Sequence, residues 1–346
     1  MTAVRNRPRA RRGLCALLLV AAAAWGGDDL GAILEGAPPL PQGYAGVKEL
    51  QKAINAGKYE VIGPQHVEIA DGTVVEKDIE YGRIGDYVLL LDLYRPKQVD
   101  EPVPGLVFVH GGGWGEKGKD FYAYWTARYA NRGYVCATIE YRMSWEAKFP
   151  AAVEDAKCAV RWMRANAAKY GVDPAQIGVI GLSAGAHLAL MVAYTPHLLD
   201  LEGNAGHADQ SSRVQAVVSY YGATDLVADG VRDLKAVRQF IGKRFRKAPG
   251  QYLKASPITH VSKDAPPTLL FHGAIDATVP VAQSDALANK LRLLGVPCLY
   301  DRQPGWDHAM DLLVDVNRRC LYIQDRFLDR FLPPDPQVGF LSWPVN

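Results

Sequence analysis

The chain has 346 residues, of which 49% are hydrophobic and 22% are charged, a composition typical of a globular protein with a large core. Lysine and arginine (39) nearly balance aspartate and glutamate (37), so the formal net charge is only +2. This balance argues against nucleic acid or a membrane surface as a partner, because both require a strongly basic patch. Length alone allows one domain or two.

The first 24 residues have the pattern of a secretory signal peptide. An apolar run over residues 14–24 is too short to span a bilayer, and Ala22 and Ala24 form an A-x-A cleavage pattern. Five arginines precede the run: Arg5, Arg7, Arg9, Arg11 and Arg12. We therefore expect cleavage near Trp25 and a secreted or periplasmic protein without a stable membrane span. A membrane anchor or a basic tail is the alternative interpretation.

Four cysteines follow the predicted cleavage site: Cys136, Cys158, Cys298 and Cys320. Their even number permits disulfides in an exported chain. Packed free thiols are favoured, because Cys136 lies in an apolar strand and Cys158 on a helix. Cys298–Cys320 is the disulfide to test first, and Cys136–Cys158 is the other pair considered. No C-x-x-C or H-x-x-x-H spacing predicts a structural zinc site.

Residues 25–75 form an N-terminal extension whose role the sequence leaves open. The extension contains several prolines and one amphipathic stretch, in which Val47, Leu50 and Ile54 recur at helical spacing. It either covers the mouth of a site or straps the back of the domain that follows.

Residues 76–335 are predicted to form one α/β domain. It begins with an antiparallel hairpin of residues 77–83 and 87–94, joined by a Gly-Asp turn. Further strands are predicted at 106–109, 134–140, 177–180, 214–221, 268–272 and 298–302. Helices are predicted at 121–132, 150–171, 184–195, 234–241, 283–294 and 309–331. Apolar strands that alternate with helices predict a mostly parallel sheet covered on both faces, with its site at the carboxyl ends of the strands.

The strongest motif is IGVIGLSAGAHLA at residues 177–189, a short strand, a tight turn and a helix. G-x-S-x-G in this setting is a nucleophile elbow. A serine hydroxyl is a poor nucleophile, so Ser183 has to project from a strained turn toward a base and toward amide donors. Gly181 and Gly185 remove side chains that would block so sharp a turn. The pentapeptide alone also fits an ordinary strand-to-helix junction.

A glycine loop, HGGGW at residues 110–114, follows the strand at 106–109. Consecutive glycines let bare backbone N–H groups face a developing negative oxygen, as in the oxyanion holes of lipases and esterases. A flexible loop or a phosphate cradle is the alternative. The phosphate-binding motifs G-x-x-x-x-G-K-[ST] and a properly placed G-x-G-x-x-G are absent from the sequence.

An acid and a base follow the serine in the order that α/β-hydrolases use. Asp276 lies in a polar loop after a strand and is well placed to orient an imidazole. Asp225 is the rival acid, although a role in a turn fits it better. His308 lies in the loop between the last strand and the last helix. The order Ser183, Asp276, His308 differs from that of chymotrypsin and of subtilisin.

The other histidines have simpler interpretations. His187 is expected to be packed on the helix of the elbow, His272 to support the loop that carries Asp276, and His110 to shape the glycine loop. Surface or packing roles are expected for His66, His197, His207 and His260. Three tryptophans flank the inferred site and either line an acyl or aromatic pocket or pack in the core: Trp114, Trp145 and Trp306.

With these motifs in place, residues 77–331 resemble the α/β-hydrolase family. Within it they resemble the hormone-sensitive-lipase-like esterases and the bacterial feruloyl or acetyl-xylan esterase-like (BD-FAE-like) group. The motifs that carry the resemblance are HGGGW at 110–114, EYRMS at 140–144, FPAAVEDAKCAVRWMRANA at 149–167, GLSAG at 181–185, SPITHVSKDAPPTLLFHGAIDATVP at 256–280 and WDH at 306–308.

The resemblance implies the roles of six residues: Ser183 as nucleophile, His308 as base, Asp276 as acid, and the amides of Gly112, Gly113 and Ala184 as an oxyanion hole. It implies hydrolysis of short-chain or cell-wall-type esters without a metal or an organic cofactor. Peptide or amide cleavage shares the same acyl chemistry and stays open, as does a non-catalytic binding domain on the same fold.

Two departures from the family pattern stand out. Ala186 replaces a glycine that many relatives have, a change too small to disturb the elbow. A long two-helix cap before His110 is missing, and residues 227–251 form only a modest insertion. An open site suited to bulky or polymer-attached esters is therefore expected. The oligomeric state is not predicted.

Overall fold

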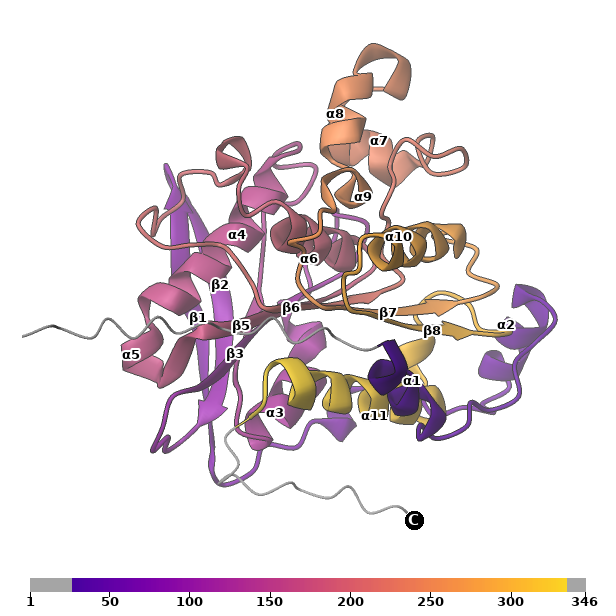
Figure 1. Ribbon diagram of the computed structural model, residues 1–346, viewed down its shortest axis with the longest axis horizontal. Helices are drawn as coiled ribbons and strands as arrows, with labels where there is room; N and C mark the ends of the chain where they lie inside the picture. Colours follow the sequence, from indigo (N-terminus) through magenta and orange to yellow (C-terminus); the bar gives the residue numbers. More distant parts are fainter. Residues whose placement is uncertain (1–26, 335–346) are drawn as a thin grey trace, which may run out of the picture.

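An eight-stranded sheet forms the centre of the molecule in the computed structural model, which describes residues 27–334 (Figure 1). Its strand order is β1-β2-β4-β3-β5-β6-β7-β8. The strands are β1 (Thr73–Ile84), β2 (Tyr87–Pro96), β3 (Val103–Val109), β4 (Val135–Ile139), β5 (Val172–Leu182), β6 (Ala216–Tyr220), β7 (Thr268–Gly273) and β8 (Cys298–Gln303). The predicted signal peptide, residues 1–24, lies outside the described residues.

The sheet is parallel except at one edge. β1 and β2 form the predicted antiparallel hairpin, and β2 also pairs antiparallel with β4. All the remaining neighbours, from β4 to β8, run parallel. β3 and β6 are buried along their whole length, as expected of strands with helices on both faces. The predicted mostly parallel sheet with an N-terminal hairpin is confirmed.

Helices cover both faces of this sheet (Figure 1). One face carries α4 (Ala151–Ala165), α6 (Ala184–Tyr194) and α10 (Ala282–Leu293); the other carries α1 (Gly27–Glu35), α3 (Ala123–Asn131) and α11 (Val314–Phe331). The shorter helices are α2 (Val47–Asn55), α5 (Ala167–Tyr170), α7 (Lys235–Ile241), α8 (Pro249–Lys254) and α9 (Pro257–His260). None of the helices in residues 27–334 is long and apolar enough to cross a membrane.

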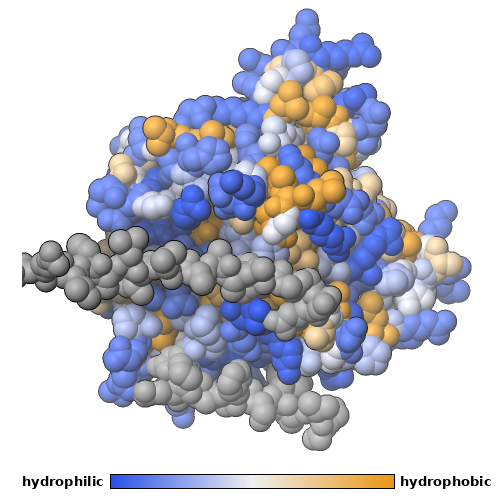
Figure 2. Space-filling view, in the orientation of Figure 1, coloured by the Kyte–Doolittle hydropathy of each residue, from blue (hydrophilic) through white to orange (hydrophobic). Residues whose placement is uncertain are grey.

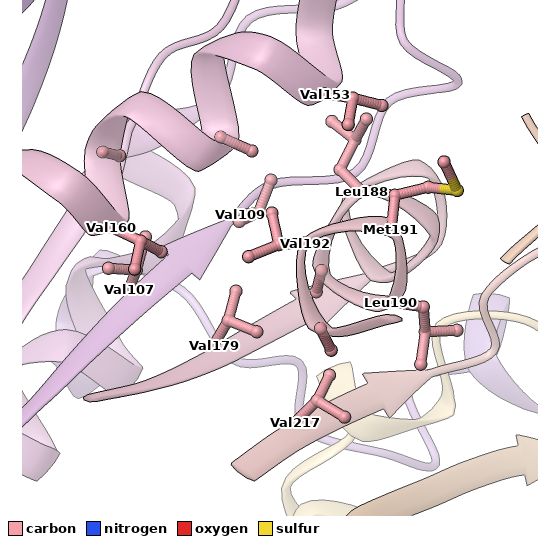
Figure 3. Close-up of a cluster of buried hydrophobic side chains, with 14 of the residues drawn as sticks. Val107, Val109, Val153, Val160, Val179, Leu188, Leu190, Met191, Val192 and Val217 are labelled. Carbon is pink, nitrogen blue, oxygen red and sulfur yellow. The ribbon is translucent and has the colours of Figure 1, made fainter. Parts of the chain in front are cut away.

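The core between the sheet and α6 explains why this helix forms where it does. All eleven residues of α6 are buried, and a helix that is mostly apolar on every side requires such surroundings. In Figure 3 its aliphatic side chains lie against valines of β3, β5 and β6 and of α4. The labelled residues are Val107, Val109, Val153, Val160, Val179, Leu188, Leu190, Met191, Val192 and Val217. The helix that follows Ser183 is therefore held rigidly.

The segment after α6 and β6 projects from the domain. α7 and the first half of α8 lie in the predicted insertion at residues 227–251, and both helices extend away from the sheet together with α9 (Figure 1). The surface in Figure 2 is mostly hydrophilic, and hydrophobic residues interrupt it on this projecting segment. Leu234 and Leu253, which belong to this segment, are exposed.

One predicted helix begins later than expected, and one helix was not predicted. The predicted helix at 309–331 begins only at Val314, because Leu313 is extended and pairs with Val61 of the N-terminal extension in an antiparallel bridge. Residues 310–312 form a short 3-10 turn instead. The sequence also did not predict α1, whose Leu30 and Leu34 pack against the core cluster that contains α11.

The four cysteines in the described part of the chain are free thiols. The Cys298–Cys320 disulfide considered above does not form, and neither does Cys136–Cys158. Cys320 is buried, and its Sγ accepts a hydrogen bond from Nε2 of Gln303 at 3.2 Å. Burial raises the pKa of the Cys320 thiol well above its ordinary value. These residues are packing residues, as the sequence favoured.

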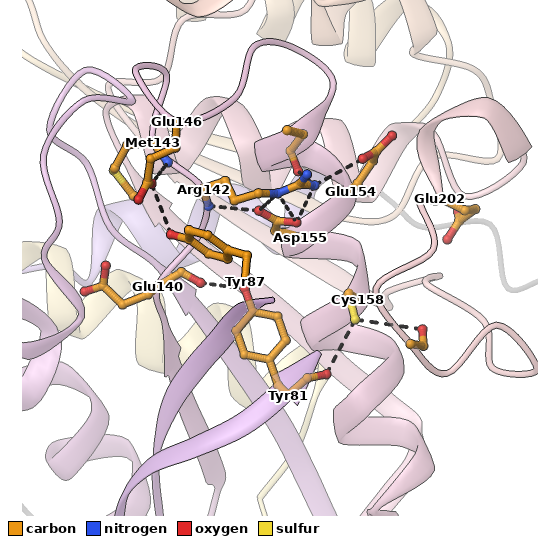
Figure 4. A network of polar contacts seen from close by, with 12 residues as sticks. Tyr81, Tyr87, Glu140, Arg142, Met143, Glu146, Glu154, Asp155, Cys158 and Glu202 are labelled. Atoms are coloured by element: carbon orange, nitrogen blue, oxygen red, sulfur yellow. Dashed lines mark hydrogen bonds and ion pairs between the residues drawn. The ribbon is translucent and has the colours of Figure 1, made fainter. Parts of the chain in front are cut away.

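A buried ion pair holds the loop after β4 against α4 (Figure 4). The Asp155 side chain is fully buried, and both of its oxygens bind the guanidinium of Arg142, with Nη2 to Oδ1 at 2.8 Å and Nε to Oδ2 at 2.9 Å. The backbone N–H of Arg142 donates to Oδ2 as well, at 2.8 Å. Glu154, which is more exposed, is a second and weaker partner of Arg142 at 3.2 Å.

Asp155→Asn is expected to lower the free energy of unfolding by about 3 to 5 kcal/mol, because it leaves the largely buried Arg142 without its main counter-charge. Urea unfolding at neutral pH measures this. Glu154→Gln is the matched control, since it removes the more exposed partner of the same guanidinium and should cost about 1 kcal/mol or less. Equal losses of unfolding free energy in the two variants would contradict the assignment of Asp155 as the main counter-charge of Arg142.

Candidate active site

Ser183 occupies a strained turn between β5 and α6. Its backbone has φ 54° and ψ −120°, a left-handed conformation that a residue with a side chain rarely adopts. A Cβ on Gly181 would overlap the backbone of Gly185, and a Cβ on Gly185 would overlap the carbonyl oxygens of Val109 and His110. The two glycines therefore permit the turn, and they also let the start of α6 approach the end of β3.

The structure brings Ser183, Asp276 and His308 together in one hydrogen-bonded line. Nε2 of His308 lies 3.0 Å from Oγ of Ser183, and Nδ1 of His308 lies 2.7 Å from Oδ2 of Asp276. The three residues come from the ends of β5, β7 and β8. Ser183 is half-buried, the His308 side chain is 17% exposed and that of Asp276 is fully buried. This order of contacts is the one that nucleophilic acyl chemistry requires.

Asp276 is held as a charged acceptor. Oδ1 accepts hydrogen bonds from the backbone N–H groups of Thr278 and Val279, both at 2.8 Å. Nε2 of His272 lies 3.2 Å from Oδ2. Burial alone would raise the pKa of this carboxyl. The hydrogen bonds from His272 and His308, with the charge of His308 and the Val279 amide, outweigh burial and lower the pKa to about 2.

A buried tyrosine and a buried carboxyl lie behind His308, and the sequence analysis missed both. The ring of Tyr221 packs against the imidazole at 4.4 Å between centroids, and its hydroxyl donates to Oδ1 of Asp311 at 2.6 Å. Burial raises the pKa of Asp311 to about 6, although the hydrogen bond from Tyr221 opposes the shift. Tyr221 directly follows β6, so its place at a strand end was the available signal.

The glycine loop lies directly beside Ser183. A Cβ on Gly111 would come within 3.3 Å of the Ser183 Cβ. Gly112 and Gly113 have φ angles of 91° and 58°, a region that glycine enters at low cost. Ala184 is the first residue of α6, and the first N–H groups of a helix have no partner within it.

The EYRMS segment supports this loop, a role that sequence reasoning did not assign. The Tyr141 hydroxyl contacts the carbonyl oxygens of His110 and Gly111 at 3.0 and 3.2 Å. The backbone N–H of Ser144 donates to the carbonyl of Trp114 at 2.6 Å. Because the ion pair between Arg142 and Asp155 anchors the same segment to α4, that pair also fixes the glycine loop.

The three tryptophans do not share a pocket. Trp114 is buried, where its ring stacks on Phe240 at 4.6 Å and Nε1 donates to His187, so it is a core residue. Trp145 is 60% exposed and donates to the carbonyl of Gly115. Trp306 is buried at the start of the loop that carries His308, and it lines a pocket described below.

The remaining candidates have the structural roles expected of them. His187 is buried, with Nε2 2.7 Å from the Ala255 carbonyl, and burial lowers its pKa to about 4. The ring of His110 stacks on Tyr141 at 4.4 Å. Asp225, the rival acid, accepts a hydrogen bond from the N–H two residues later in a local turn. Two of the other histidines form hydrogen bonds away from the site: His66 with Glu60, and His260 with the carbonyl of Lys254.

Comparison with known proteins identifies relatives of this chain. The BD-FAE family model matches residues 91–291. Two proteins of Mycobacterium tuberculosis are similar to it: the probable carboxylic ester hydrolase LipM is 36% identical over 68% of this chain, and the esterase LipQ is 37% identical over 70%. The matches cover 56% and 59% of those proteins, so the chain spans less than two thirds of the length of these curated relatives.

Solved structures of esterases share the fold. Esterase Est2 of Thermogutta terrifontis has a TM-score of 0.65 and 27% identity, over 77% of this chain and 95% of its own. A truncated carbohydrate esterase from gut microbiota has a TM-score of 0.63 and 27% identity, over 76% and 96%. Together with the sheet order and the family match, these likenesses show that the chain has the α/β-hydrolase fold and belongs to the BD-FAE family.

Proposed function

We propose that the protein is a serine esterase, which hydrolyses carboxylic esters through an acyl-enzyme. The observation that carries the proposal is the line of contacts from Ser183 through His308 to Asp276, with the glycine loop beside the serine. The relatives named as esterases support it. This arrangement of three residues gives a non-catalytic binding domain no evident advantage.

In the proposed mechanism, His308 accepts the proton of Ser183 at Nε2 while Oγ attacks the ester carbonyl carbon. The amides of Gly112, Gly113 and Ala184 stabilise the negative oxygen of the tetrahedral intermediate. The imidazolium then returns its proton to the leaving alcohol as the bond from carbon to this oxygen breaks. Water, activated by the same imidazole, hydrolyses the acyl-enzyme in the second step. The mechanism uses no metal and no organic cofactor.

Short acyl groups are the proposed substrates on the acid side. Structures similar to this chain include Est2 with propionate or butyrate bound and the gut carbohydrate esterase. Acetyl and feruloyl esters of the cell-wall type stay within this proposal. An open site is supported by Ser183, which is only half-buried.

Activity outside the cytoplasm is also proposed, on the pattern of residues 1–24. The expected result is that the protein recovered from the periplasm or the medium of the producing cells begins near Trp25. N-terminal sequencing measures this. Recovery only in the membrane fraction with Met1 retained would contradict cleavage.

Ser183→Ala is expected to abolish turnover of p-nitrophenyl acetate, butyrate and octanoate, methyl ferulate and acetylated xylan, because it removes the attacking oxygen. The loss in kcat should be on the order of 10⁶-fold. Wild-type rates on the same set rank the acyl groups. If the wild type cleaves only amide substrates, and does so through Ser183, the amidase alternative replaces this proposal.

Asp276→Asn is expected to lower kcat by about 10⁴-fold, because the amide no longer holds His308 in the tautomer that accepts the serine proton. The pKa of Asp276 is about 2, so the wild-type carboxylate stays charged across the neutral range and the loss should persist there. Steady-state kinetics from about pH 6 to about pH 9 measure it. Asp225→Asn, at the rival acid, is the control and should keep near wild-type kcat. If Asp225→Asn loses activity and Asp276→Asn keeps it, Asp225 is the acid that orients His308.

A further inference from the structure

The N-terminal extension and the loop of His308 line a pocket that is open to solvent. It has a volume of about 230 Å³ and lies between α2 and residues 306–313. From the extension, Val47, Leu50, Gln51 and Ile54 of α2 line it, together with Val61. From the other side, the loop contributes Trp306, Asp307, His308, Ala309, Met310, Leu312 and Leu313. α2 lies at the end of the sheet where β8 terminates (Figure 1).

The extension is fixed to both ends of this loop. At the first end, the backbone N–H of Tyr44 donates to the carbonyl of Gly305 at 2.9 Å. At the other end, Ile62 donates to Leu312 at 2.8 Å, and Val314 donates to the carbonyl of Glu60 at 3.0 Å. These backbone hydrogen bonds make the pocket a built part of the fold.

Aromatic packing adds to these bonds. The rings of Tyr44 and Tyr59 contact Trp306 edge-on, with centroids 6.2 and 5.5 Å away. Leu50 and Tyr59 are buried in the same core cluster as Trp306. These contacts hold the extension against the start of the His308 loop.

The lining of the pocket is chemically simple. Apart from Gln51, Asp307 and His308, every lining residue is apolar. Oδ1 of Asp307 is already bonded to the backbone N–H of Ala277 at 2.9 Å, so this carboxylate is partly satisfied within the protein. Burial of an apolar group against these residues is favourable.

The position of His308 indicates which part of an ester the pocket receives. In the proposed reaction, Nε2 of His308 returns its proton to the leaving oxygen, so this oxygen has to lie within hydrogen-bond reach of the imidazole. The group bonded to that oxygen then extends along the wall that contains His308. Neither Ser183 nor residues 110–114 of the glycine loop, beside which the carbonyl oxygen would lie, line the pocket, which meets the catalytic residues at His308.

We propose that α2 and the His308 loop form the alcohol-binding pocket, which takes an apolar alcohol group such as benzyl or hexyl. This inference rests on the proposed esterase function and specifies its alcohol side. The size agrees, because a cavity of about 150 Å³ lined by aliphatic and aromatic residues holds benzene. The extension is thus a specificity element, and Gln51, Val47, Ile54 and Val61 are its determinants.

The test compares two tryptophan variants on the same helix. Gln51→Trp puts a large ring at a residue that lines the pocket, and Lys52→Trp puts it at the next residue, which is exposed like Gln51 but does not line the pocket. Two ester series are measured with wild type and both variants. One keeps the acetyl group and varies the alcohol from methyl to hexyl to benzyl; the other keeps methanol and varies the acid from acetate to hexanoate.

Gln51→Trp is expected to lower kcat/KM for hexyl and benzyl acetate by about 10- to 100-fold and to leave methyl acetate and methyl hexanoate near wild type. Lys52→Trp should match wild type on both series. Binding of benzyl alcohol to the Ser183→Ala protein, followed by NMR titration, should weaken when Gln51→Trp is added.

Three results would overturn the inference. A loss confined to the acid series would make the pocket an acyl site, and equal behaviour of the two tryptophan variants would show that the pocket does not select the alcohol. Both results leave the esterase proposal intact. If wild type shows no Ser183-dependent hydrolysis of any ester, the esterase proposal fails and this inference fails with it.

Discussion

The parallel pairing of β3, β5, β6, β7 and β8 is the constraint on which the rest of this molecule depends. Its register aligns the ends of the strands: Val109 pairs with Gly181, Leu182 with Tyr220, Tyr220 with Phe271, and Gly273 with Gln303. Every connection that carries a site residue therefore leaves the sheet at the same edge. Residues that lie more than a hundred positions apart in the chain meet there without any special linkage.

Alignment of the strand ends brings the catalytic side chains near one another but does not set the distances between them. Two further sets of contacts, outside the sheet, hold the loops that carry these side chains or lie beside them. On one side, the buried ion pair between Arg142 and Asp155 fixes the segment that supports the glycine loop. On the other side, the extension binds the loop of His308 before and after the histidine. The proposed reaction depends on the distance from Oγ of Ser183 to Nε2 of His308. Both the glycine loop and the His308 loop have to be held in place, because small displacements of the donor and acceptor atoms weaken a hydrogen bond steeply.

Much of the site could be predicted from the sequence because its signals are local. The glycines around Ser183 and in the loop at 110–114 indicate backbone conformations and close contacts that are unfavourable for other residues. Asp276 and His308 each follow a strand, and the parallel sheet converts this pattern into proximity. Tyr221 and Asp311 were missed because the one available signal, the position of Tyr221 at a strand end, does not distinguish a tyrosine behind an imidazole from one in the core. The Cys298–Cys320 pair was considered on count alone, and the packing leaves both as thiols.

The sequence by itself determined the class of fold, the order of the strands and helices along the chain, and the three residues that meet at the strand ends. Each of these follows from hydrophobic periodicity, glycine placement or order along the chain, which act over a few residues. Only the tertiary structure decided where residues 27–75 lie, that Leu313 pairs with Val61 instead of beginning a helix, and that α2 and His308 face a common pocket. These features arise from contacts between segments about 250 residues apart. A local sequence pattern cannot predict such contacts, because they depend on the shapes and the burial of side chains in the finished fold.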